Sequence, residues 1–151
     1  MSSLPFLREV LTEQEWAFVE HPELPVVRVE VESTSGAWEL YVELREEAQQ
    51  LLAYSVYSVE LTPKRRHALA ELLHRINCDL VIGCFELDYE GSAVRMRTSA
   101  DMAVTRPSRA LLERLVVGNT LMMELHLGSI NAVASGTMSA TEAIIAAASL
   151  D

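Results

Sequence analysis

Cysteine is scarce in this sequence, with two in 151 residues, so a disulfide framework is excluded as the basis of the fold. Cys78 and Cys84 lie six positions apart, a spacing that fits neither a CxxC redox motif nor a four-ligand zinc site. We interpret both as small buried hydrophobic residues. A chain of this length can bury a sufficient core without covalent or metal cross-links.

Positive charge is scarce as well. There are 12 basic side chains against 22 acidic ones, which gives a formal net charge of -10. This charge repels a phosphate backbone, whose binding requires clustered Lys and Arg, so we do not expect a nucleic-acid ligand. It also disfavours an anionic membrane surface. Basic or amphipathic partners are favoured.

Long hydrophobic runs are missing. The most apolar stretch, residues 111–134, contains Glu113, Arg114, Glu124 and His126, and is too polar to cross a bilayer. The first residues lack the basic and apolar regions of a secretory signal. We therefore expect a cytoplasmic protein.

The composition is that of one globular domain. Half of the residues, 50%, are hydrophobic and 23% are charged, far from the composition of disordered chains. No repeat or linker divides the chain, so we expect a single domain over residues 1–151.

Period-two patterns predict three strands in the first half of the chain. Residues 26–32 and 38–45 alternate apolar and polar side chains around a turn at 33–36, which is typical of a β-hairpin with one buried face. Residues 51–61 are rich in strand formers, but both of their faces are partly apolar. One parity holds Leu51, Ala53, Tyr57, Val59 and Leu61, and the other holds Leu52, Tyr54 and Val56.

A second hairpin is predicted around Glu90-Gly91. A tight turn there places Leu87 opposite Val94, Phe85 opposite Met96 and Glu86 opposite Arg95, so each face receives matched side chains.

Helices are predicted before, between and after these strands. Apolar residues recur at helical spacing in residues 4–11, and Thr62-Pro63 is a strong helix start, with Asn77 as a left-handed terminator. Pro107 begins a long apolar helix in which Gly118 and Gly128 predict a kink, a break or close packing. Ser139 and Glu142 form the capping box of a last helix.

The predicted fold is α+β. We expect a mainly antiparallel five-stranded sheet with helices packed on one face, in the order α-β-β-β-α-β-β-α-α.

The residues from Asn77 to Asp101 carry a family resemblance. They read N-x-x-L-x-x-G-x-F-E-L-D-x-x-G-x-x-V-R-x-R-T-S-x-D after a helix led by Pro63, and with residues 12–16 and 139–144 they resemble the YbjN family, in particular its cyanobacterial-type members. The resemblance implies a fold similar to type III secretion chaperones, which are small, acidic, frequently dimeric proteins that hold partner segments. It implies no known biochemical activity.

Two places depart from the family pattern. The late helix has Leu125-His126-Leu127-Gly128-Ser129 where an aromatic residue and a Pro-Gly step are expected, and Cys84 stands where a small polar residue is expected. Any function of the family at those places is in doubt here.

No catalytic or metal motif stands out. His67, Glu71 and His74 share a helix face at metal-ligand spacing, but a solvated face explains them better. Glu86 and Asp88 share a strand face with Arg95 and Arg97, so cross-strand ion pairs account for these carboxylates. The basic cluster Lys64-Arg65-Arg66 is open to an acidic ligand or to compensation by nearby carboxylates. We expect no cofactor, no metal and no enzymatic activity.

Apolar side chains that remain after the core is assigned are the feature that points to function. If Tyr57, Val59 and Leu61 face the helices, then an outer patch forms from Tyr41, Leu52, Tyr54 and Val56. Such a patch marks a partner or dimer contact, unless helices carrying Met122, Met123, Met138, Ile144 and Ile145 cover it.

Two functions follow from these features. The preferred one is a homodimeric, chaperone-like or regulatory adaptor that binds a partner segment through the outer sheet face or an exposed edge strand. The alternative is a small-molecule-binding domain or an enzyme, with a pocket between sheet and helices that gathers Asn119, His126 and Asn131.

Overall fold

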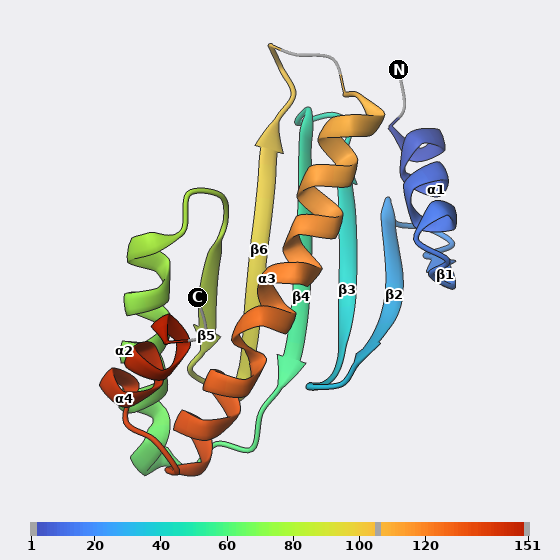
Figure 1. Ribbon diagram of the computed structural model, residues 1–151. Helices are drawn as coiled ribbons and strands as arrows, with labels where there is room; N and C mark the ends of the chain where they lie inside the picture. The colour runs from blue at the N-terminus through green and yellow to red at the C-terminus, as the bar shows by residue number, and fades with distance from the viewer. Residues whose placement is uncertain (1–2, 105–106, 150–151) are drawn as a thin grey trace.

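A computed structural model describes residues 3–104 and 107–149 of the chain (Figure 1). Six strands form one antiparallel sheet in the order β1-β2-β3-β4-β6-β5. The strands are β1 (Phe18–Glu20), β2 (Val26–Ser33), β3 (Gly36–Arg45), β4 (Gln50–Ser58), β5 (Cys84–Asp88) and β6 (Ala93–Asp101). The α+β class and the antiparallel sheet are as predicted.

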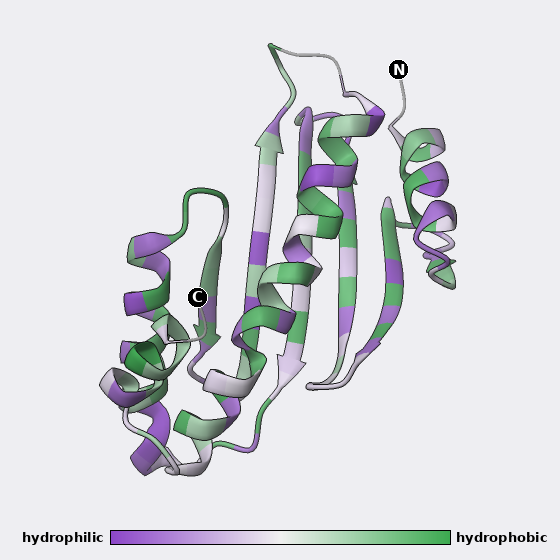
Figure 2. Cartoon of the chain, viewed as in Figure 1, coloured by the Kyte–Doolittle hydropathy of each residue, from purple (hydrophilic) through white to green (hydrophobic). Residues whose placement is uncertain are grey.

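The hairpin of β2 and β3 has the predicted faces. Val29 pairs with Leu40 and Val31 with Trp38, and these side chains are buried on the same side of the sheet. Figure 2 shows the alternation of hydrophobic and hydrophilic residues along both strands. The period of two therefore determined which face of the hairpin joins the core.

The prediction of five strands is wrong by one, because β1 adds a sixth at the edge beside β2. Phe18 pairs with Val29 and Glu20 with Val27, and Arg8 of the first helix binds Glu20 at 2.6 Å. Three residues are too few to produce a recognisable alternation, so the strand exists through its backbone pairing with β2.

The described residues form four α-helices on one side of the sheet. They are α1 (Leu4–Glu13), α2 (Arg66–Asp79), α3 (Arg109–Ser135) and α4 (Ala140–Ala148), and a 3-10 turn (Pro63–Arg65) precedes α2. The helix α4 packs on α2 and α3. In Figure 1, α3 runs along the sheet, with α1 on one side of it and α2 and α4 on the other. Within the residues described, no helix combines the length and the hydrophobicity needed to span a bilayer.

Of the two helix-end predictions for this segment, the start is confirmed and the end is wrong. Helical structure begins at Pro63 directly after Thr62, although the Thr62 side chain makes no capping hydrogen bond. Asn77 does not end its helix, which continues to Asp79. Its amide accepts from the Phe85 N–H at 2.7 Å and donates to the Phe85 carbonyl at 2.9 Å. Asn77 thus attaches β5 to α2. The capping box of Ser139 and Glu142 is confirmed, with hydrogen bonds of 3.1 and 2.7 Å.

The glycines of α3 do not interrupt it, contrary to the prediction. The helix runs unbroken for 27 residues, and a Cβ added at Gly118 or Gly128 would meet no atom within 4 Å apart from its chain neighbours and the nearby helix backbone. Neither a break nor close packing within the described chain explains these glycines.

A buried amide attaches α3 to the centre of the sheet. Asn119, fully buried, donates through Nδ2 to the carbonyl of Ala53 in β4 at 3.0 Å and to that of Met96 in β6 at 2.8 Å. The Thr98 hydroxyl donates to the Leu115 carbonyl at 2.7 Å. These bonds fix the position of α3 within an otherwise apolar core.

Asn119→Leu should lower the free energy of unfolding by about 2 kcal/mol, because two buried carbonyls lose a hydrogen-bond donor. Urea unfolding followed by circular dichroism measures the change. Ser99→Ala, at an exposed position of β6, is the control and should change stability by less than about 0.5 kcal/mol. Equal stability of the two variants would contradict this role of Asn119.

Candidate interaction surfaces

The four residues of the predicted outer patch lie together on the sheet face opposite the helices, which we call the outer sheet face. Tyr41 of β3 stands directly opposite Tyr54 of β4, while Leu52 pairs with Glu43 and Val56 with Glu39. The methionines and isoleucines proposed as a cover belong to α3, α4 and the segment between them, on the other face. No helix of the described chain covers the patch.

The side chains of the outer patch are only partly exposed to solvent. Leu52 retains only 8% of its accessible surface, and Tyr41, Tyr54 and Val56 are half-buried. The guanidinium of Arg95 lies 5.7 Å from the centre of the Tyr54 ring, and such a cation stacks favourably on an aromatic face. The patch is therefore an aromatic centre bordered by arginine.

The Tyr41 hydroxyl donates a hydrogen bond to the Glu39 carboxylate. This bond, together with partial burial and the negative charge of Glu39, raises the pKa of Tyr41. The tyrosine is therefore held neutral, with its ring oriented against the neighbouring strands.

Ion pairs between neighbouring strands surround this centre. Glu86 of β5 binds Arg97 at 2.7 Å and Arg95 at 3.0 Å, which confirms part of the predicted cross-strand pairing. Asp88 instead accepts from the Glu90 N–H at 3.1 Å in the turn. Each exposed pair is worth under about 1 kcal/mol, so these pairs contribute little to stability but place arginines beside the carboxylates of this face.

The edges of the sheet are poorly suited to adding a further strand. At the β5 edge, Asn77 occupies both backbone hydrogen-bonding groups of Phe85. At the other edge, β1 is three residues long. Short or blocked edges resist pairing with another chain, so the face is the better contact surface.

The helix residues at metal-ligand spacing do not form a metal site in the described part of the chain. Glu71 binds Arg75 at 2.7 Å, and His67 and His74 are exposed. No group of three or more His, Cys, Asp or Glu side chains in residues 3–104 and 107–149 is arranged to hold a metal ion.

The basic cluster has a structural explanation for two of its members. Arg65 donates to the carbonyl of Val133 at 2.8 Å and to that of Met138 at 3.0 Å, and so binds the connection between α3 and α4. Arg66 stacks 5.6 Å from the centre of the Tyr89 ring. A cation at the carbonyl end of a helix is favourable, and an acidic ligand is not needed to account for Arg65.

The polar trio of the alternative prediction is not brought to one site. Asn119 binds the sheet, Asn131 accepts from the Tyr57 hydroxyl at 2.8 Å, and His126 meets the Phe85 ring edge-on at 5.4 Å between centroids. None of the three lines either of the two hollows described below. The three polar side chains therefore do not line a common ligand pocket in the described part of the chain.

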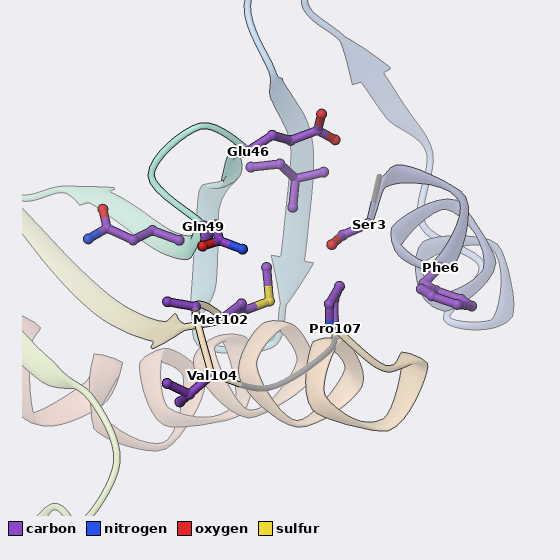
Figure 3. Close-up of a pocket in the computed structure, with 10 residues that line it drawn as sticks. Ser3, Phe6, Glu46, Gln49, Met102, Val104 and Pro107 are labelled. Carbon is purple, nitrogen blue, oxygen red and sulfur yellow. The ribbon is translucent and has the colours of Figure 1, made fainter. Parts of the chain in front are cut away.

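An open hollow of about 680 Å³ lies between the start of α1, the turn from β3 to β4, and the segment after β6 (Figure 3). Phe6, Met102, Val104 and Pro107 supply apolar walls, and Glu46 is the one charged residue among the described residues that line it. Among those residues, a single carboxylate with amide and apolar neighbours does not form an acid-base pair.

A second hollow of about 610 Å³, which we call the α3 groove, was missed by the sequence analysis. It lies between α3 and the loop from α2 to β5, and Val81, Ile82, Leu121 and Met122 line it. Val81 is 97% exposed, and just beyond the groove Leu125 is 68% exposed. Two features of the sequence indicate this groove. Residues 80–82 are apolar but lie outside any predicted element, and the apolar residues of α3 are not confined to one side of the helix.

The cysteines differ from their predicted burial. Cys78 is exposed on α2, and Cys84 is half-buried on the outer sheet face, where its sulfur lies 3.4 Å from the Arg97 guanidinium. Both thiols are free.

The comparisons with known proteins concern the family and the fold. A sequence model of the YbjN family, described as "Putative bacterial sensory transduction regulator", matches residues 5–118. A crystal structure of YbjN from E. coli, described as a putative transcription regulator, is similar with a TM-score of 0.62 and 15% identity, over 87% of this chain and 93% of that one. At this identity the likeness shows the fold alone. No curated protein matches the sequence.

Stability should depend on pH through His126. Burial lowers the pKa of His126 in the folded protein, so the unfolded chain takes up this proton first as the pH falls. The free energy of unfolding should therefore be highest above about pH 6.5 and decrease below it, toward the folded pKa. Urea unfolding at about pH 7.5 and about pH 5.5 measures this decrease.

His126→Gln should make the decrease smaller, while His67→Gln, at an exposed position of α2, should leave it as in the wild type. An unchanged decrease in His126→Gln would show that other groups cause it.

Proposed function

The chain belongs to the YbjN family, and from that premise we propose that it is a non-enzymatic regulatory adaptor of chaperone-like type that binds a segment of a partner protein on its outer sheet face. The observation that carries this proposal is the pair of tyrosines, Tyr41 and Tyr54, at the centre of a sheet face without a helix over it.

The composition of this face suits protein recognition. Tyr and Arg are enriched at the centres of protein interfaces, because they combine a large apolar contact area with hydrogen-bonding groups. Here Arg95 stacks on Tyr54, and Val56 and Leu52 continue the surface along β4. A segment laid across β3 and β4 would cover the two rings and exchange water for apolar contact.

The charges of the face favour a segment that is not strongly charged. Arg28 already binds Glu39 at 2.9 Å, and Arg45 binds Glu43 at 2.7 Å. A highly charged segment would have to break these pairs. An amphipathic segment can use the tyrosines while its polar side stays in water, which agrees with the preference drawn from the net charge.

The regulatory part of the proposal follows the family description, and E. coli YbjN is described as "a putative transcription regulator". A chain with a net charge of -10 is poorly suited to contact DNA itself. If it acts on transcription, we infer that it does so through a protein. We also place it in the cytoplasm, where free thiols such as Cys78 stay reduced.

Tyr54→Glu should abolish partner binding and leave the fold intact. The substitution puts a carboxylate in the middle of the apolar contact, while the neighbouring Arg95 and Arg97 compensate it in the free protein, so stability should change by less than about 1 kcal/mol. Cross-linking in cells of the source organism, affinity purification and mass spectrometry measure which proteins remain bound.

Tyr89→Glu is the matched control, because Tyr89 is an exposed tyrosine in the turn beside α2 and stacks on Arg66. The same proteins should be captured by the wild type and Tyr89→Glu, and lost in Tyr54→Glu. A photo-crosslinking side chain at position 56 should react with those proteins directly. Capture that survives Tyr54→Glu would contradict the assignment of this face.

A further inference from the structure

The side of α3 that faces away from the sheet is apolar. Val116, Met123 and Ile130 are fully buried on the sheet side. The opposite side carries a stripe at alternating spacings of three and four, which we call the α3 stripe: Leu111, Arg114, Gly118, Leu121, Leu125, Gly128 and Ala132. Leu121 is 54% exposed and Leu125 is 68% exposed. A helix at a protein surface normally presents polar residues there, so this side requires a covering partner.

The two glycines of the stripe have no explanation within one chain. Glycine in a helix interior lowers helix stability relative to alanine, yet Gly118 and Gly128 have ordinary helical backbone and open space around them. A residue without a side chain on the exposed side of a helix allows another helix to approach closely.

The stripe is arranged symmetrically about Met123. Leu121 and Leu125 lie two residues to either side of it, and Gly118 and Gly128 lie five residues to either side. When two copies of one helix pack antiparallel about a twofold axis, a residue on the centre line of the contact meets the one at the mirrored position. A residue on a flank close to the axis approaches its own copy, because the axis keeps each flank on the same side. Leucine then meets leucine, and glycine meets glycine.

We propose that a second copy of this chain docks on the α3 stripe, with the two α3 helices antiparallel about a twofold axis at the level of Met123. This dimer goes beyond the proposed function and does not depend on it, because the outer sheet face lies on the other side of the sheet and stays open in both copies.

The α3 groove completes the contact. In the antiparallel arrangement, the half of α3 after Met123 in one copy lies over the half before Met123 in the other, which is the half that borders the groove. Leu125 of the second copy therefore faces Leu121 and the ledge of Val81 and Ile82. A stable interface buries about 800 Å² on each side, more than a single helix stripe roughly 30 Å long supplies, and the ledge widens the contact.

Charges at the stripe make the arrangement specific. Arg114 of one copy comes beside Ala132 of the other, in the last turn of its helix, where the negative end of the helix dipole favours a cation. Glu124 lies on one flank, and the two copies of Glu124 approach each other near the axis, while the two copies of Met122 meet on the other flank. The contact of Arg114 with the helix end stabilises the dimer, and the approach of the two Glu124 side chains weakens it.

The mass of the full chain in solution tests the proposal. Sedimentation over a concentration series up to roughly 100 µM should give twice the chain mass of 16.8 kDa, and Leu121→Glu or Leu125→Glu should raise the dimer dissociation constant about 30-fold or more. Ile145→Glu, at a residue of α4 that is 61% exposed, is the control and should leave the dimer unchanged. A monomeric wild type, or a dimer that persists in Leu121→Glu, would overturn the proposal.

Substitutions of the symmetric positions test the geometry. Glu124→Gln should lower the dissociation constant by about two- to threefold at low salt, because it removes the repulsion near the axis. Gly118→Leu should dissociate the dimer without lowering the thermal unfolding midpoint of the monomer, since the new side chain meets open space in a single chain. A dimer unaffected by both changes would place the contact elsewhere.

Disulfide formation distinguishes antiparallel from parallel helices. In a background of Cys78→Ser and Cys84→Ser, copies carrying Leu121→Cys should cross-link with copies carrying Leu125→Cys more than either variant does with itself. Preferred self-pairing of Leu121→Cys would contradict the twofold arrangement. Tyr54→Glu should keep the dimer mass, so loss of partner capture and loss of the dimer can be told apart.

Discussion

The packing of α3 on the sheet is the interaction on which the rest of this structure depends. The helix places Val116, Met123 and Ile130 on the apolar side of the strands, and Asn119 connects it to both β4 and β6. These two strands are neighbours in the sheet but are separated along the chain by α2 and β5. Because α1 and α2 also contact α3, one on each side, its position determines where the other helices pack.

Because the described helices lie on one side of the sheet only, two surfaces face the solvent: the outer sheet face and the side of α3 that points away from the sheet. On the outer sheet face, arginines and glutamates pair within β3 and between neighbouring strands around Leu52 and Tyr54, so β-forming side chains lie there without a helix of the described chain over them. The outer side of α3 has no such covering, since Leu121 and Leu125 remain more than half exposed. The two surfaces therefore present different chemistry to the solvent.

The two departures from the family pattern fall on these same surfaces. The segment Leu125-His126-Leu127-Gly128-Ser129 stands where an aromatic residue and a Pro-Gly step were expected, and without proline the helix continues unbroken to Ser135. Cys84 lies at the border of the outer sheet face beside Arg97. Leu125 is 68% exposed and Gly128 is exposed, while Leu127 between them is fully buried, so the change in α3 reaches both the surface and the core.

The sequence by itself determined the elements whose side chains repeat in register with the backbone: the β2–β3 hairpin, the pairing of Phe85 with Met96, the capping box at Ser139 and the two faces of β4. These follow from periods of two and 3.6 residues and from local hydrogen bonds. Only the tertiary structure decided which segments distant in the sequence come into contact. The strand β1 forms only through pairing with β2, and Asn77 binds β5 through its side-chain amide. Asn119 and Asn131 have different hydrogen-bond partners, and Val81 lies beside Leu121 in the α3 groove. The physical reason is that these contacts join segments far apart in the chain, and a period within one segment carries no information about which other segment it will meet.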